Sequence, residues 1–249
     1  MSAHQTVLVT GANRGIGRGL LSVYLSRPNT TGVAAVRDPI SATSISLSSL
    51  PLGPGSKLIV VKIDSSVTTD PLAAIDFLKS EHKVTSLDIV IANAGMVEFY
   101  GDVTQTPIDG MKDHLNVNTV SVLALFQAVW PLLKEGKTPK FITVSSTVGS
   151  IGEAEKWQLK ACAYGASKAA LNYLTKVIHI ENPGLIAFPI HPGWVQTDMG
   201  NRGATNNGLE EAPTTVQECV DGMIDKIDGA TKEKTSGTFV SADGEKVIW

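Results

Sequence analysis

Cysteine is scarce in this chain, which has only Cys162 and Cys219 among its 249 residues. The two stand far apart in the sequence, so no disulfide framework is suggested, and a reducing intracellular compartment fits this usage best. We therefore expect the protein in the cytoplasm. No group of Cys and His residues has the spacing of a zinc site, so we predict no bound metal.

Clusters of positive charge are also lacking. The net charge is −3, and without a basic patch the chain has little to attract nucleic acid or an anionic membrane. No apolar run approaches the length of a membrane span. Residues 1–5 lead directly into a strand-like run, so we expect no signal peptide. Neither nucleic acid nor a membrane is a predicted partner.

The composition itself is that of a globular protein, 43 % hydrophobic and 18 % charged, and short apolar runs alternate with helical patterns. Strands are predicted at residues 6–9, 33–36, 58–61, 87–92, 141–144, 185–190 and 238–240. Helices are predicted at residues 15–26, 71–81, 108–134, 161–181 and 216–227. Residues 41–56 favour a poor helix or an irregular loop, and Pro131 is expected to kink or shorten the helix that contains it.

This alternation predicts the fold class. Short strands that are almost entirely apolar suit a parallel sheet, because helices cover both of its faces. No break in composition marks a linker. We predict an α/β fold, with one doubly wound parallel sheet of the Rossmann type and helices on both faces, as a single domain over residues 1–249.

A glycine-rich turn joins the first predicted strand to the first predicted helix. Its sequence is Thr10-Gly11-Ala12-Asn13-Arg14-Gly15-Ile16-Gly17. Glycines at such a turn let the backbone bend sharply and approach a ligand, and the free N–H groups at the helix start can face a pyrophosphate. The alternative is a strand–helix turn without a ligand. The position of the turn favours a dinucleotide.

Tyr164 and Lys168 stand four residues apart on a predicted helix, so their side chains share one face. A free tyrosine is a poor acid or base at neutral pH, because its reference pKa is about 10. We expect the neighbouring ammonium to favour the phenolate and to lower that pKa. A proton donor beside a cation suits the reduction of a carbonyl group, although such pairs also occur by chance on many helices.

The glycine spacing, Gly-x3-Gly-x-Gly after Thr10, resembles that of the short-chain dehydrogenase/reductase family. The resemblance covers nearly the whole chain. It continues at Asn93-Ala94-Gly95, Asn118, Ser145-Ser146, the Tyr164/Lys168 pair and Pro192-Gly193. Each motif alone is modest, but their order and spacing together are specific.

The resemblance implies a set of site residues. The implied catalytic residues are Asn118, Ser146, Tyr164 and Lys168. The implied coenzyme contacts are Gly11, Asn13, Arg14, Gly15, Ile16, Gly17, Arg37, Asp64, Asn93, Ala94, Gly95, Tyr164, Lys168, Pro192, Gly193, Val195 and Thr197. In the family the serine steadies the carbonyl oxygen, the lysine also bonds the nicotinamide ribose, and the asparagine positions a water in a proton relay. Ser146 is favoured over Ser145 because the family's serine is the second of the pair.

Positive charge at the end of the second strand indicates which nicotinamide coenzyme is used. NAD-binding turns usually carry an acid there, whereas this chain has Val36 and Arg37. A guanidinium can hold a 2′-phosphate with paired hydrogen bonds, and Arg14 is a second cation within reach. We therefore predict NADP(H). The alternative is that Arg37 only pairs with Asp38 at the surface.

The substrate side is less constrained. Met96, Phe99, Tyr100, Trp157, Trp194 and Met199 are candidates to line an apolar pocket, or are ordinary core residues. Ser146 and Tyr164 are separated by 18 positions, more than is common in the family. The extra piece, residues 153–158, shapes the pocket or is a solvated loop. Residues 200–213 resemble a mobile lid, which places a predicted substrate lid at about 194–213.

Residues 212–216 and 230–240 also resemble the C-terminal part of a fungal polyketide-pathway ketoreductase of the same family. The likeness implies the subgroup of NADPH-dependent carbonyl reductases and not the substrate. We expect a small-molecule ketone of an aromatic or polyketide type, and other ketones or aldehydes remain open. Two alternatives remain: an NADP(H)-binding sensor or scaffold without turnover, and a redox-neutral cyclase or dehydratase. Family members usually associate through their two long helices, so the resemblance also implies a homodimer or homotetramer.

Overall fold

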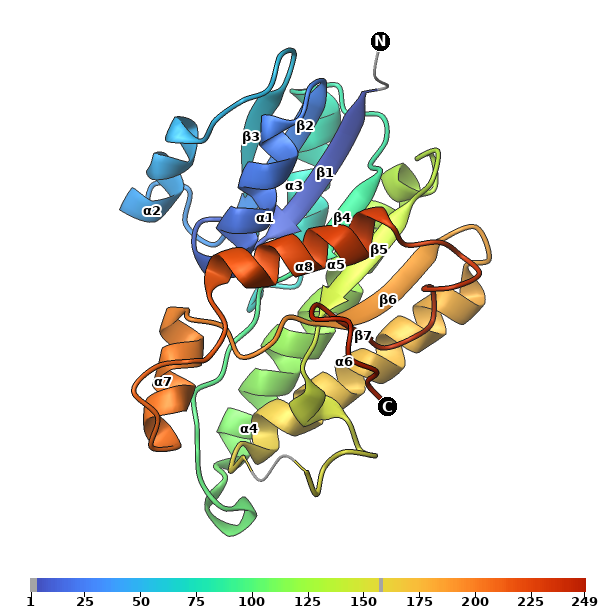
Figure 1. Cartoon of the computed structure of the whole chain (residues 1–249). Helices are drawn as coiled ribbons and strands as arrows, with labels where there is room; N and C mark the ends of the chain where they lie inside the picture. Colours follow the sequence, from blue (N-terminus) through green and yellow to red (C-terminus); the bar gives the residue numbers. More distant parts are fainter. Residues whose placement is uncertain (1–3, 157–158) are drawn as a thin grey trace.

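The computed structural model describes residues 4–156 and 159–249. A seven-stranded sheet with the order β3-β2-β1-β4-β5-β6-β7 runs through the molecule, and all its strand pairs are parallel (Figure 1). The strands are β1 Gln5–Thr10, β2 Thr30–Val36, β3 Lys57–Lys62, β4 Ile89–Ala92, β5 Lys140–Val144, β6 Ile186–His191 and β7 Val240–Ser241. The predicted doubly wound parallel sheet is confirmed.

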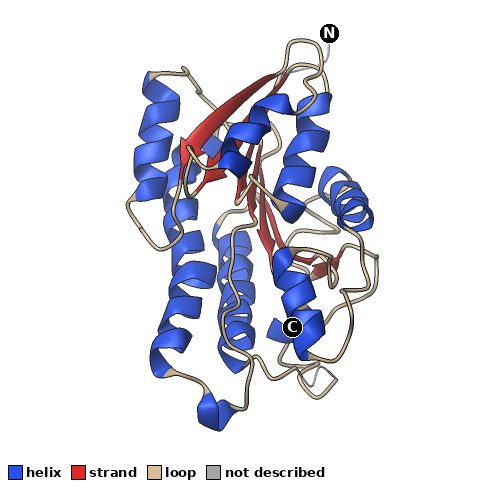
Figure 2. Cartoon of the chain, turned by 90° about the vertical axis from the view of Figure 1, so that its left-hand side faces the viewer, coloured by secondary structure: helices blue, strands red, loops and turns tan. Residues whose placement is uncertain are grey.

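Helices cover both faces of this sheet (Figure 2). The α-helices are α1 Gly15–Ser26, α2 Ala42–Ile45, α3 Asp70–Ser80, α4 Ile108–Leu115, α5 Ser121–Leu133, α6 Cys162–Glu181, α7 Asp198–Asn206 and α8 Val216–Asp228. Shorter helical turns are η1 Ser46–Ser49, η2 Val103–Gln105, η3 Asn116–Val120 and η4 Thr147–Gly149. Helices α1 and α8 contribute to one hydrophobic cluster, and α3, α5 and α6 to the other.

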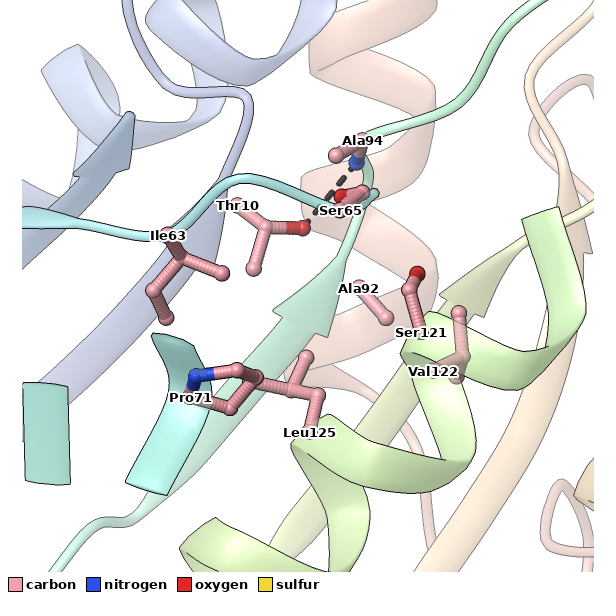
Figure 3. Close-up of a pocket in the computed structure, with 9 residues that line it drawn as sticks. All are labelled: Thr10, Ile63, Ser65, Pro71, Ala92, Ala94, Ser121, Val122 and Leu125. Atoms are coloured by element: carbon pink, nitrogen blue, oxygen red, sulfur yellow. Dashed lines mark hydrogen bonds between the residues drawn. The ribbon is translucent and has the colours of Figure 1, made fainter. Parts of the chain in front are cut away.

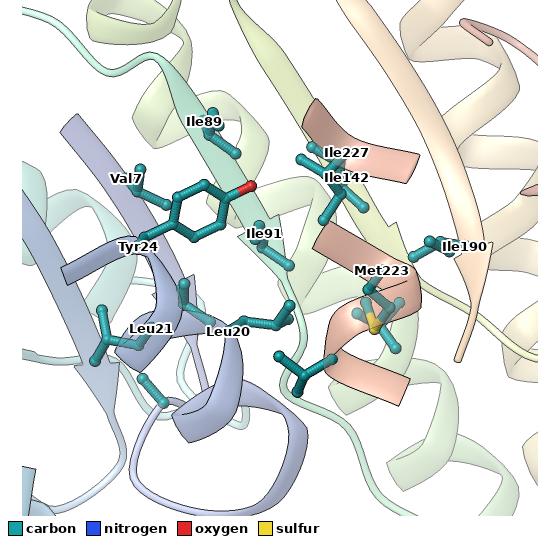
Figure 4. Packing of buried hydrophobic residues seen from close by; sticks show 14 of the residues in the cluster. Val7, Leu20, Leu21, Tyr24, Ile89, Ile91, Ile142, Ile190, Met223 and Ile227 are labelled. Carbon is teal, nitrogen blue, oxygen red and sulfur yellow. The ribbon is translucent and has the colours of Figure 1, made fainter. Parts of the chain in front are cut away.

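The two clusters form because successive strand residues point to opposite faces. In β1, Val7 and Val9 join the cluster with α1 and α8, while Leu8 joins the cluster on the other face. Figure 4 shows Leu20 and Met223 packing towards the strands on the first face. Each such side chain contributes about 1.5–3 kcal/mol when fully buried, so the two layers together fix the sheet that carries the site.

One long helical run spans Ile108–Leu133, as predicted, but it contains a wider π-helical turn, η3, between α4 and α5. Asn118 lies in this turn and is fully buried. Pro131 lies within the last turn of α5, which continues to Leu133. The proline therefore does not end the helix, although an i→i−4 hydrogen bond is lost there.

By length and composition, the run Ile108–Leu133 is apolar enough to cross a membrane, with a mean hydropathy of 1.3 in its most apolar window. The core helix of a globular domain passes the same test. Here Val122, Leu125 and Val129 are buried against the sheet, so the run is a core helix on that side. Only 39 % of the window is buried within the chain, which leaves apolar surface on its other side.

Two local predictions differ from the structure, and one open alternative is decided by it. The open choice at 41–56 resolves into helix α2, whose Ser41 side chain accepts a hydrogen bond from Ser44 N, followed by η1. The last strand is β7, two residues long and beginning at Val240. Helix α7 occupies part of the segment that the sequence indicated only as a lid. Its glycines and asparagines have low helix propensity, which hid the helix from a pattern search.

Candidate active site

The glycine-rich turn lies between β1 and α1 and leaves room for a ligand. Gly15 has a φ of 52°, which disfavours any residue with a Cβ atom. At Gly17 a Cβ would collide with the carbonyl oxygen of Gly11. Within the described residues, no side chain caps the first N–H groups of α1. These donors stay available, so the turn fits a pyrophosphate.

A second turn, after β4, is bonded to the first. The Thr10 hydroxyl accepts hydrogen bonds from the backbone N–H groups of Asn93 and Ala94, both at 3.0 Å. The Asn93 side-chain amide donates to Thr10 O at 2.9 Å and to Gly11 O at 3.4 Å. The predicted coenzyme residues Asn93 and Ala94 therefore lie beside the glycine turn, and the amide of Asn93 holds that turn in shape.

A small apolar pocket opens at the carboxyl ends of β1, β3 and β4 (Figure 3). Its lining residues are Thr10, Ile63, Ser65, Pro71, Ala92, Ala94, Ser121, Val122 and Leu125. Asp64 follows Ile63. Burial raises the pKa of the Asp64 carboxyl, but hydrogen bonds from Ser66 and the charges of Arg37 and Lys62 outweigh this effect and hold the pKa below its usual value.

The two predicted cations of the coenzyme site are both exposed. Arg37 follows β2, and no ion pair joins it to Asp38 in the part of the chain that the structure describes. Asp38 instead accepts a hydrogen bond from Ile40 N at 3.1 Å. The Arg14 side chain turns towards α7, where its Nη1 lies 2.8 Å from Asp198 Oδ2. In this structure Arg14 therefore pairs with an acid on the substrate side.

Ser146, Tyr164 and Lys168 come together at the ends of β5 and the start of α6. Lys168 is buried, its Nζ lies 5.7 Å from the centre of the Tyr164 ring, and it donates to Val144 O at 2.8 Å. A side-chain hydrogen bond links Tyr164 and Ser146. At Gly95 a Cβ would lie 3.1 Å from Asn118 Oδ1 and 3.5 Å from Lys168 Nζ. All four predicted catalytic side chains thus lie in one region.

Burial determines the acidity of the two titrating groups. It raises the pKa of Tyr164 to about 12, and the hydrogen bond with Ser146 offsets only part of this rise. Burial also lowers the pKa of Lys168 to about 8. The expectation that the ammonium lowers the tyrosine pKa is therefore wrong for this structure, because desolvation of the phenolate dominates. At neutral pH Tyr164 is a neutral phenol, the form that donates a proton.

The Asn118 amide connects two chain segments. Its Oδ1 accepts from Met96 N at 2.8 Å, and its Nδ2 donates to Met96 O at 3.0 Å and to Ser167 Oγ at 2.9 Å. The loop after β4 is thereby held against α6. This bonding also fixes the backbone of Met96, a predicted pocket residue.

Sequence reasoning missed Asn172, which is buried one helical turn beyond Lys168. Its Oδ1 accepts from Ser145 Oγ at 2.5 Å, and its Nδ2 donates to Gly149 O at 3.3 Å. These partners lie on either side of Ser146, so Asn172 supports the turn that presents the serine. The repeat of four from Tyr164 through Lys168 was a signal that could have found it.

The segment after β6 closes the other side of the site. Two backbone hydrogen bonds join the ends of the segment 194–214, which carries α7. Gln196 N donates to Thr214 O at 2.8 Å, and Thr214 N donates to Trp194 O at 3.0 Å. Thr197 caps α7, because its Oγ1 accepts from Gly200 N at 3.1 Å. Thr197 Cγ2 would lie 3.1 Å from a Cβ at Gly15. The predicted coenzyme residue Thr197 therefore adjoins the glycine turn.

Some of the predicted pocket residues surround the space between α7 and the loop after β4. The Trp194 indole donates to Gly200 O at 2.9 Å, and the Tyr100 hydroxyl would lie 3.0 Å from a Cβ at Gly203. Met199 is half-buried in α7. Trp157 lies outside the described residues.

The remaining predicted coenzyme residues lie around the same turns. Asn13 donates from its amide to Thr43 Oγ1 at 2.8 Å. Ile16 is the second residue of α1, and Val195 is buried in the first cluster. Pro192 and Gly193 directly follow β6, where Gly193 has a φ of 88°. The candidate site thus combines a phosphate-binding turn, an apolar pocket and a phenol beside an amine.

Comparison with known proteins agrees with this geometry. A family model described as short chain dehydrogenase matches residues 5–207. A norsolorinic acid ketoreductase from Dothistroma septosporum is 46 % identical, with 100 % of this chain and 94 % of that protein aligned. The norsolorinic acid ketoreductase from Aspergillus parasiticus is 43 % identical, with 97 % and 90 % aligned.

The fold has a similar counterpart among solved structures. The NADPH-bound carbonyl reductase from chicken fatty liver superimposes with a TM-score of 0.87 at 31 % identity, with all of both chains covered. Because the family model covers most of the chain and the relatives align over nearly their full length, this protein belongs to the short chain dehydrogenase family.

Proposed function

We propose that this chain is an NADPH-dependent carbonyl reductase in which Tyr164 donates the proton. The observation that carries the proposal is the placement of Tyr164 beside Lys168, whose Nζ lies 5.7 Å from the centre of the phenol ring, with Asn118 in the same region. Reduction of a ketone needs a proton donor at the carbonyl oxygen, and burial keeps this phenol protonated over the neutral range.

The residues around the glycine turn fit a phosphorylated dinucleotide. The uncapped start of α1 offers N–H donors to the pyrophosphate. Exposed Arg37 is available for a 2′-phosphate because it is not paired with Asp38 within the described residues. When bound, the reduced nicotinamide supplies a hydride.

Each catalytic side chain then has one task. The hydroxyls of Ser146 and Tyr164 donate hydrogen bonds to the substrate carbonyl oxygen and stabilise the charge that develops there. Tyr164 passes its proton to that oxygen. Lys168, with a pKa of about 8, is mainly an ammonium at neutral pH and stabilises the phenolate that remains. The bonding of Asn118 to Met96 and Ser167 keeps this group assembled.

The substrate class proposed is an aromatic or polyketide-type ketone. Two similar fungal proteins are named for the reduction of norsolorinic acid, and aromatic side chains of this chain, Tyr100 and Trp194, adjoin α7. The segment 194–214, which carries α7, acts as the substrate lid in this proposal, and its two ends are hydrogen-bonded at Trp194–Thr214.

A second copy of the chain is the proposed partner. Helices α4, α5 and α6 expose apolar side chains that the chain itself does not cover. They are Ile108, Leu123, Tyr173 and Ile180, and Val120 of η3 is exposed beside them in the chain. Packing these helices against the same helices of a second copy would bury this surface in a symmetric interface.

The direct test is NADPH consumption with a panel of aryl and polyketide ketones, repeated with NADH. The expected result is turnover of at least one aryl ketone, with a clear preference for NADPH. Binding of NADPH without turnover of any ketone would instead indicate a sensor or scaffold. Product formation without NADPH loss would indicate a redox-neutral reaction.

A further inference from the structure

We propose that residues 246–249, termed the C-terminal strap, hold the loop 150–156 against the substrate site and thereby determine which ketones fit. The inference rests on the proposed carbonyl reductase function for its substrate. Hydrogen bonds and side-chain packing hold the strap in place, and these contacts lie far from the glycine-rich turn.

The chain reaches the loop by reversing direction after β7. Gly244 has a φ of 85° and lies in a turn closed by its N–H bond to Ser241 O at 3.1 Å. Lys246 then pairs antiparallel with Val240. The strap therefore runs back beside β7 and α6, and Figure 1 shows the end of the chain next to both elements.

Trp249 anchors the strap to the catalytic helix. Its ring lies 5.7 Å from that of Phe239, and Lys176 Nζ lies 5.4 Å from its centre. The same Nζ donates to Gly237 O at 2.6 Å. Lys176 is two helical turns beyond Lys168 on α6, so the strap is fixed to the helix that carries Tyr164.

Two backbone carbonyls of the strap bind the start of the loop. Trp249 O accepts from Gly152 N at 2.8 Å, and Ile248 O accepts from Ser150 Oγ at 2.7 Å. A Cβ at Gly152 would lie 2.7 Å from Ile248 Cδ1, so the contact is close. Ser150 Oγ also accepts a hydrogen bond from Glu153 N at 3.1 Å. The contacts of the strap are therefore connected to the middle of the loop.

Beyond residues 157–158, which lie outside the described part of the chain, the chain is held again at Lys160. Lys160 O accepts from Gly101 N at 2.7 Å, and the Lys160 ammonium pairs with Asp102 at 3.1 Å. Gly101 follows Tyr100, which adjoins α7. The loop begins just after the turn that carries Ser146, so its position limits the space next to the reacting carbonyl. The strap holds the loop at Ser150 and Gly152, and the Gly101 contact holds the chain at Lys160.

The test compares Trp249→Ala, which removes the ring anchor, with Ser150→Ala, which removes the hydroxyl that bonds Ile248 O. Lys246→Ala is the matched control, since Lys246 belongs to the strap but contacts β7 by its backbone. Limited trypsin digestion at Lys156 and Lys160 reports loop opening without any substrate. Kinetics with a bulky aryl ketone and with a small ketone report pocket shape, and NADPH fluorescence reports coenzyme binding.

Both test variants are expected to be cleaved in the loop roughly fivefold faster than the wild type, as the loss of a hydrogen bond or an aromatic contact predicts. The KM for the bulky ketone should rise relative to that for the small one, with NADPH affinity and the Lys246→Ala control unchanged. Wild-type cleavage rates, or an unchanged ratio of the two KM values, would overturn the inference. Should the wild type reduce no ketone, the proposed function fails while the cleavage rates still decide the strap.

Discussion

Residues spaced by four along α6 have different properties because their surroundings differ. Tyr164 and Lys168 both lose hydration, which raises the pKa of the phenol to about 12 and lowers that of the amine to about 8. In each case burial shifts the equilibrium towards the neutral form, although Lys168 stays mainly an ammonium at neutral pH. The sequence showed that the two residues form a pair, but it did not show how burial shifts their pKa values. Burial depends on β5 and on the loop after β4, which are distant from the pair in the chain.

The pKa of Lys168 predicts the pH dependence of ketone reduction. Below about pH 8 the amine is protonated and can stabilise the phenolate, so kcat/KM should be flat there. As the pH rises through about 8 the ammonium is lost, and kcat/KM should fall. Tyr164 stays protonated across this window, so it does not contribute to the fall. Lys168→Met should retain a low rate with no inflection near pH 8; an unchanged inflection in that variant would contradict the assignment.

The pairing of Arg14 with Asp198 predicts a change in coenzyme affinity. Both side chains are exposed, so the ion pair is weak. Asp198→Asn should free Arg14 and remove the negative charge next to it, and the Kd for NADPH should fall roughly two- to fivefold, with a smaller change for NADH. Asp225→Asn, which removes another exposed pair on α8, is the control. Weaker NADPH binding by Asp198→Asn would argue that Asp198 holds Arg14 in its binding position.

At the scale of elements, η4 presents Ser146, and Asn172 of α6 supports it through Ser145 and Gly149. Asn172→Ala should lower kcat about tenfold, because the serine turn loses support on both sides, while NADPH affinity stays the same. The effects of Asn172→Ala and Ser145→Ala should be non-additive in a double-mutant cycle. Fully additive effects would show that the two side chains act independently.

Most elements were predictable because their sequence signals are local. Helix α1 was predicted with the bounds observed, since the glycine turn begins it and Pro28 follows its end. Helix α7 was not, because it contains Gly200 and Gly203 and depends on distant contacts. The Trp194 indole bonds Gly200 O, and the Tyr100 ring packs at Gly203. Such tertiary support is absent from a pattern of propensities.

The candidate site was predicted to a similar extent. The glycine turn and the Tyr164/Lys168 pair carry their chemistry in local spacing. The position of Asp198 beside Arg14, and that of Asn172 behind Ser146, depend on how α7 and α6 pack. The substrate pocket is least predictable, since Tyr100, Trp194 and the loop 150–156 come from three separate segments.

At the scale of the whole molecule, the order of the sheet explains where the site lies. The chain starts at β1, builds outwards to β3, and then returns to β4 on the other side of β1. The chain therefore leaves β1 and β4 in opposite directions at the carboxyl edge of the sheet. Open α/β sheets bind their ligands at such a point. The hydrogen bonds of Thr10 and Asn93 hold the two turns at this point.

The uncovered apolar face of α4, α5 and α6 predicts an assembly of identical chains. Tyr173 on α6 is 74 % exposed and lies on this face. Tyr173→Glu should shift the protein towards monomers in analytical ultracentrifugation, because a charge would be buried in the interface. Leu52→Glu, also at an exposed apolar position, is the control and should leave the assembly unchanged. A wild type that is monomeric at micromolar concentration would contradict this interface.

The role of Tyr164 as proton donor is the claim on which the proposed chemistry depends, and kcat/KM of Tyr164→Phe for ketone reduction with NADPH tests it most directly. Loss of the hydroxyl should reduce kcat/KM about 100-fold or more, the usual contribution of a general acid, while the Kd for NADPH remains that of the wild type. Reduction at the wild-type rate by Tyr164→Phe would contradict the assignment of Tyr164.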